Sequence, residues 1–154
     1  MAVTPIKLYM PTALETVFTH ATLKNLANGA ELLSAALGAT LDPWGDLIAA
    51  ISWATAPSAG VVAFEVYLLP CVDGTNYPSQ GADGLPQKAL LVGSLESRLP
   101  TTNALEYMAL RRIPLPPGDF KILISNTSAQ AVANDDDVTM FVKLQRYQMG
   151  SGSA

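Results

Sequence analysis

The feature that most constrains the fold is a series of short segments in which apolar and polar residues alternate. In residues 61–69, for example, Phe64 and Val66 fall on one face and Glu65 on the other. A period of two residues is that of a half-buried β-strand. The sequence therefore predicts strands in segments that are bounded by turn-forming residues and cover 45–56, 61–69, 88–97, 105–113, 119–126 and 138–147.

Two further segments leave the secondary structure open. Residues 29–41 could form a helix, but Asn28-Gly29 and Gly38 favour turns, so a strand near Glu31–Ala36 is the preferred interpretation. Residues 12–20 could form either a short helix or an extended strand. No strand-helix-strand alternation occurs, so we predict an all-β antiparallel sandwich, jelly-roll-like, with an N-terminal arm.

The chain of 154 residues fits one domain. Residues 1–20 are predicted to be an N-terminal arm or lead-in, because Pro5 and Pro11 interrupt any long helix there. Residues 21–148 form the predicted sandwich. Residues 149–154 are rich in Gly and Ser and are predicted to be a flexible tail.

The charge of the chain excludes some classes of partner. Only 14% of residues are charged, and the net charge is -4. Nine Lys and Arg are scattered, with Arg111-Arg112 the only adjacent pair, so nucleic-acid binding is not expected. No apolar run is long enough for a membrane span, and the first residues do not resemble a signal peptide. We therefore expect no nucleic acid and no membrane among the partners, and synthesis in a reducing cytoplasm.

No catalytic motif is visible. His20 is the only histidine and Cys71 the only cysteine, so a disulfide and a thiolate zinc cluster are excluded within the chain. No G-x-S-x-G or phosphate-binding glycine motif is present. His20 is interpreted as a surface or interface residue and Cys71 as an inert thiol. We expect a protein that is not an enzyme and has no cofactor.

An acidic run, Asp135–Asp137, is the one local concentration of charge. Loop carboxylates are common calcium ligands, but the spacing is not that of a calcium-binding loop. A solvated turn is the preferred interpretation, so no metal site is predicted.

Three stretches resemble sequences in virion proteins of tailed bacteriophages. They are Val66–Tyr77, which reads VYLLPCVDGTNY, Pro114–Lys121, and Ile124–Thr127. The resemblance extends over residues 46–147. It implies a small jelly-roll-like structural protein that decorates or cements the capsid or lies in the tail. It also implies a virion location and the major capsid protein or other virion proteins as partners. It brings no catalytic residues with it.

Low charge suits a protein that buries much of its surface in a homo-oligomer, because neutral faces pack without desolvating charges. The candidate interface residues are Leu8, Tyr9, Met10, Leu14, Val17, Phe18, Asn76 and Tyr77. The first six are apolar and precede the predicted strands; packing within the sandwich is the equal alternative for them. The function predicted first is capsid decoration. The alternative is a tail- or fibre-associated module that binds a carbohydrate or receptor through Asn76 and Tyr77.

Overall fold

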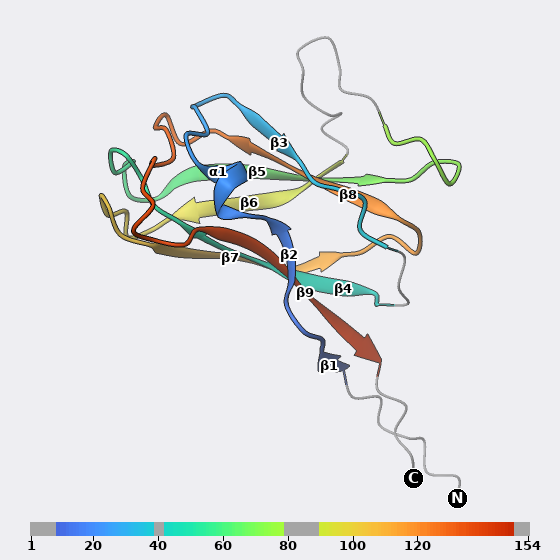
Figure 1. Ribbon diagram of the computed structural model, residues 1–154. Coiled ribbons are helices and arrows are strands. Elements are labelled where there is room, and N and C mark those ends of the chain that lie inside the picture. The colour runs from blue at the N-terminus through green and yellow to red at the C-terminus, as the bar shows by residue number, and fades with distance from the viewer. Residues whose placement is uncertain (1–8, 39–41, 79–89, 150–154) are drawn as a thin grey trace, which may run out of the picture.

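The computed structural model of the protein describes residues 9–38, 42–78 and 90–149. They form one short helix and two antiparallel sheets packed face to face (Figure 1). The elements are β1 (Tyr9–Pro11), β2 (Glu15–Phe18), α1 (His20–Leu23), β3 (Glu31–Leu33), β4 (Trp44–Ile51), β5 (Val61–Pro70), β6 (Leu91–Ser97), β7 (Glu106–Pro114), β8 (Phe120–Asn126) and β9 (Phe141–Met149). The predicted tail, 149–154, lies outside the described residues apart from Met149, the last residue of β9.

The strand pairing is that of a jelly roll. One sheet has the order β1-β9-β4-β7, with β2 also paired to β9, and the other has the order β3-β8-β5-β6. The pairs β2–β9, β3–β8, β4–β7 and β5–β6 are nested, as in one long hairpin whose tip is β5–β6. Rolling this hairpin up gives two sheets of alternate strand pairs, which confirms the predicted jelly-roll-like sandwich.

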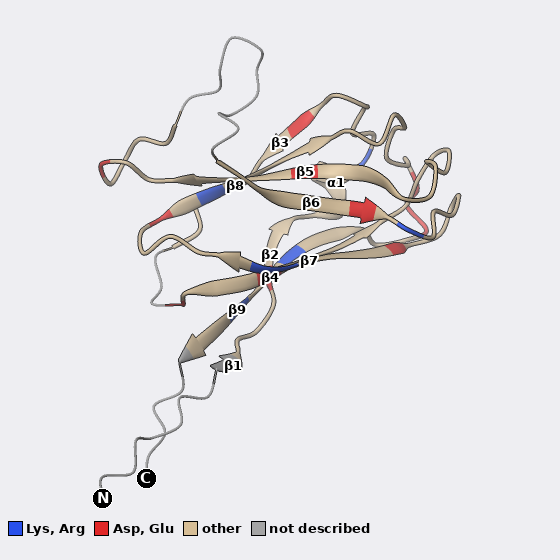
Figure 2. Cartoon of the chain, turned by 180° about the vertical axis from the view of Figure 1, so that it is seen from behind, with Lys and Arg blue, Asp and Glu red and all other residues tan. Residues whose placement is uncertain are grey.

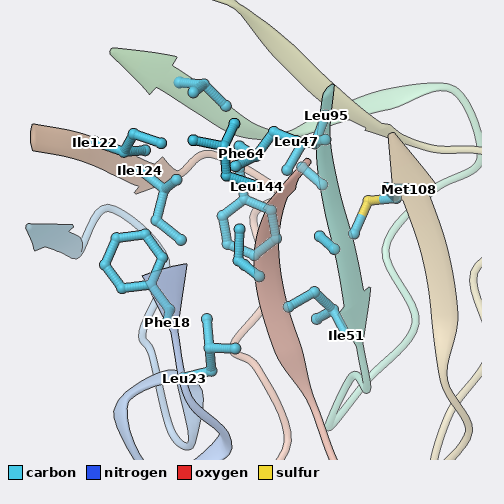
Figure 3. Packing of buried hydrophobic residues seen from close by; sticks show 14 of the residues in the cluster. Phe18, Leu23, Leu47, Ile51, Phe64, Leu95, Met108, Ile122, Ile124 and Leu144 are labelled. Carbon is cyan, nitrogen blue, oxygen red and sulfur yellow. The ribbon is translucent and has the colours of Figure 1, made fainter. Parts of the chain in front are cut away.

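The core lies between the two sheets (Figure 3). Its apolar side chains come from the inward-facing positions of both sheets and from α1, which contributes the fully buried Leu23. The rings of Trp53 and Phe64 stack with their centroids 5.7 Å apart. Each of these large side chains removes about 150–250 Å² of surface from water, so they supply much of the apolar burial.

The central strand β5 is buried on both faces, whereas the alternation predicted one buried face. Phe64 and Val66 face the core, as expected. On the opposite face, Tyr67 and Leu69 are buried with Leu123 and are covered by Tyr77 and Leu90. Between Ala63 and Leu69, only Glu65 is half-exposed, and it accepts a hydrogen bond of 2.6 Å from the Tyr67 hydroxyl. Tyr77 and Leu90, from the segment between β5 and β6, thus cover the outer face of this sheet.

The sandwich includes β2, which precedes residue 21, the predicted first residue of the sandwich. β2 pairs with β9, and Phe18 is 3% exposed within the core. Residues 12–20, for which a helix and a strand both remained open, contain the strand β2 and the first residue of α1. By contrast, β1 pairs only with the end of β9, and the two extend together beyond the body of the sandwich (Figure 1).

Candidate functional site

The predicted N-terminal interface residues divide into four groups. Leu8 lies outside the described residues, and Tyr9 and Met10 belong to β1. Leu14 is 48% exposed just before β2. Val17 packs against the core, and Phe18 is part of it. The structure therefore places Val17 and Phe18 inside the sandwich, where a neighbouring subunit cannot reach Phe18.

The loop after β5 uses Asn76 and Tyr77 for its own folding. The Asp73 carboxylate accepts hydrogen bonds from the backbone N–H of Thr75 (3.0 Å) and of Asn76 (2.7 Å), and from the Asn76 side-chain amide (2.7 Å). These bonds, with those of Asn76 the strongest, lower the pKa of Asp73. The half-buried Tyr77 ring packs on the outer layer over β5, with the Lys121 Nζ 4.4 Å from its centroid. These contacts are those of an ordered loop, in which Asn76 is exposed and Tyr77 is half-buried.

His20 is a structural residue that ties α1 to the acidic run. Its Nδ1 accepts the backbone N–H of Met140 at 3.3 Å, and its Nε2 lies 3.4 Å from Asp136 Oδ1. The Lys24 ammonium donates to the same oxygen at 2.6 Å. Asp135 accepts the backbone N–H of Asp137, which makes this run a turn, as the preferred interpretation had it. Within the described residues, no three His, Cys, Asp or Glu side chains gather to form a metal site.

Two buried charged residues hold elements together. Glu106 accepts hydrogen bonds from the Trp53 indole (2.9 Å), the Ser97 hydroxyl and the backbone N–H groups of Arg98 and Leu99. Arg146 binds Glu15 of β2 at 2.9 Å and donates to the Gly38 carbonyl, with its guanidinium over the Phe120 ring. Their hydrogen-bonding capacity serves the fold, so neither is a candidate catalyst.

A hollow of about 630 Å³ on the outer face of the β9-β4-β7 layer is the most chemically specific surface feature. It is lined by Trp44, Asp46, Arg111, Arg112 and Tyr147. Asp46 is buried at its base, and its carboxylate accepts the Tyr147 hydroxyl at 2.9 Å and the Arg112 backbone N–H at 2.8 Å. The hydrogen bond to Asp46, followed by desolvation, raises the pKa of Tyr147.

A β-bulge between β4 and β7 creates this hollow. The pairing register shifts between Gly45 and Leu47, so that both Arg111 and Arg112 lie opposite the single residue Asp46. Arg112 has a φ of 57°, a left-handed conformation that costs a non-glycine residue about 1–2 kcal/mol. At Gly45 a Cβ atom would lie 2.9 Å from the Gln145 carbonyl oxygen, so the close strand approach requires glycine. Bulges of this kind redirect side chains.

The sequence contained one signal for the hollow, the pair Arg111-Arg112, which are the only adjacent basic residues in the chain. Trp44 and Asp46 come from one strand, the arginines from a second and Tyr147 from a third. Only the position of β4 between β7 and β9 brings them together. No spacing along the chain carries that information.

A second surface feature consists of two exposed large hydrophobic side chains, Leu99 and Tyr107, near β6 and β7. β6 and β7 are the end strands of their sheets and lie on the same side of the sandwich. Around them, Tyr107 is 68% exposed and Leu99 is 81% exposed. Charged side chains lie beside them, as Figure 2 shows: Glu96 of β6 pairs with Arg98, and β7 carries Arg111. We call Leu99, Tyr107 and the outer edges of β6 and β7 the β6–β7 side.

The comparisons with known proteins leave the family open. No family model matches the chain, and no curated protein or solved structure is significantly similar to it. In the part of the chain that the structure describes, none of the helices has the length and apolar character to cross a membrane.

Proposed function

We propose that the protein is a non-enzymatic structural protein of a bacteriophage particle, most specifically an oligomeric capsid decoration or cement protein. The proposal starts from the three short stretches between residues 46 and 147 that resemble sequences in virion proteins. Its jelly-roll architecture is one that capsid proteins use, although lectins and cupins use it as well. A fold does not determine a function, so the proposal rests on the surface of the molecule.

The observation that carries the proposal is the β6–β7 side. Unpaired strand edges are a liability in a free monomer, and natural proteins cover or charge them. Here Tyr107 of β7 and Leu99, two residues after β6, expose large hydrophobic side chains beside the exposed ion pair of Glu96 and Arg98. A large aromatic residue on an open edge is typical of a subunit contact.

The low charge of the chain supports the same role. A decoration protein buries surface against several neighbours, and each charge that it buries without a partner costs several kcal/mol, to order of magnitude. Only 14% of residues are charged, against about 25% in a typical globular chain. The protein would then act mechanically, by adding buried area between neighbouring capsomers.

The test is incorporation of variants into particles. Epitope-labelled chains are supplied in an infected host, and the copies per purified particle are counted. The double variant Leu99→Ser/Tyr107→Ser is expected to be incorporated at least about tenfold less than the wild type, since central interface residues each contribute about 2 kcal/mol or more.

The matched control is Leu33→Ser, because Leu33 is 50% exposed on β3 at the opposite edge of the same sheet as β6. Its incorporation is expected to equal that of the wild type. Absence of the wild-type chain from particles contradicts the proposed function. Equal incorporation of the double variant and the wild type contradicts the role of the β6–β7 side.

A further inference from the structure

We propose that the hollow between β4, β7 and β9 is a binding site for an acidic saccharide, a sugar ring that carries a carboxylate or a phosphate group. This inference does not depend on the virion role. It starts from the volume of about 630 Å³, which lies in the range of small-molecule sites. A hollow of this size accommodates one or two sugar rings.

The charges of the hollow select an anion. The Asp46 carboxylate is buried, and its two oxygens already accept the Tyr147 hydroxyl, a guanidinium N–H of Arg111 and the backbone N–H of Arg112. The Arg111 side chain is 75% exposed and makes one long contact of 3.3 Å to Asp46, so most of its donors remain open. With the exposed Arg112, the site has two positive charges against one negative charge in a chain whose net charge is -4.

Arginine is suited to this recognition because its planar guanidinium donates two parallel hydrogen bonds to a carboxylate or phosphate. Asp46 holds both arginines in place, because its carboxylate accepts the Arg112 backbone N–H and one guanidinium N–H of Arg111. The positive φ of Arg112 fits this interpretation, because backbone strain persists where the surrounding structure enforces it, and ligand clamps are among such places.

The aromatic residues select a ring. Trp44 and Tyr147 both line the hollow and are half-buried. They flank the paired residues Gly45 and Arg146, so they lie on neighbouring strands at the same level of the sheet. Aromatic faces pack against the apolar face of a ring, and the Tyr147 hydroxyl can still accept a hydrogen bond from a sugar hydroxyl.

The experiment titrates the full chain with three probes that share one ring: glucuronic acid, glucose 6-phosphate and glucose. Binding is followed by NMR at the indole N–H of Trp44, with the buried Trp53 as internal reference. We expect at least one of the two acids to shift the Trp44 signal saturably and glucose to leave it unchanged. The response to each acid shows whether the site takes the carboxylate or the phosphate.

Two variants separate a specific site from general charge attraction. Arg111→Gln is expected to weaken binding of the acid at least about tenfold, whereas Arg98→Gln is expected to leave it unchanged. Arg98 is 82% exposed and lies outside the hollow, so the two variants lose the same charge. The proposal is overturned if neither acid shifts the Trp44 signal, if glucose binds as well as the acids, or if the two variants weaken binding equally.

Discussion

At the scale of single residues, Glu106 shows how a buried carboxylate is stabilised without an ion pair. Its two oxygens accept hydrogen bonds from one indole, one hydroxyl and two backbone amides. We expect Glu106→Gln to lower the free energy of unfolding by about 1–3 kcal/mol, because the new NH₂ group would face donors. Urea denaturation measures this. The control is the exposed Glu96, and an equal effect of Glu96→Gln would contradict the account.

Asp136 gives a prediction for acid stability. Hydrogen bonds from Lys24 and then His20 lower the pKa of Asp136 in the folded protein below its usual 3.8. Its stabilising contribution is therefore present above the unfolded pKa and is lost as the pH falls through the folded pKa. We expect Asp136→Asn to lower the Tm near neutral pH and to have a shrinking effect below about pH 4. A Tm difference that is independent of pH would contradict this.

At the scale of elements, β2 belongs to the sandwich through Phe18. Phe18→Ala is expected to cost about 3–5 kcal/mol of unfolding free energy, because the cavity cannot collapse fully in a close-packed core. Leu14→Ala, four residues earlier and 48% exposed, is the control and should cost little. Urea denaturation again measures both. A small effect at Phe18 would mean that β2 is a detachable arm after all. For the same reason, deleting residues 1–18 would damage the core as well as any arm.

An element could be predicted where neighbouring residues determine it, and not where contacts between distant parts of the chain determine it. The strands around Val66, Ile122 and Val142 were predicted because alternation is a local property. Their pairing was not, since it depends on contacts between residues far apart in sequence. The bulge at Arg112 was also not predictable: it arises from the Asp46 carboxylate, 66 residues away, taking a backbone N–H that would otherwise be free for the ladder.

At the scale of the whole molecule, the jelly roll exposes Leu99 and Tyr107 on the β6–β7 side and has a charged hollow on one sheet. The two features adjoin along β7, because Arg111 lines the hollow and also lines a second pocket together with Tyr107. The variants at Leu99 and Tyr107 and the variant at Arg111 therefore test the two proposals separately. Oligomers with closed symmetry give a fixed number of copies in a particle, which makes the stoichiometry informative.

The most direct measurement is quantitative mass spectrometry of density-purified particles from the source culture. If the protein decorates capsids, the number of its copies per copy of the major capsid protein is expected to be fixed, near one or at a simple fraction such as about one third. A few copies per particle would indicate a tail or fibre component and would contradict capsid decoration. Absence from the particles, with the protein present in the lysate, would contradict the virion role altogether.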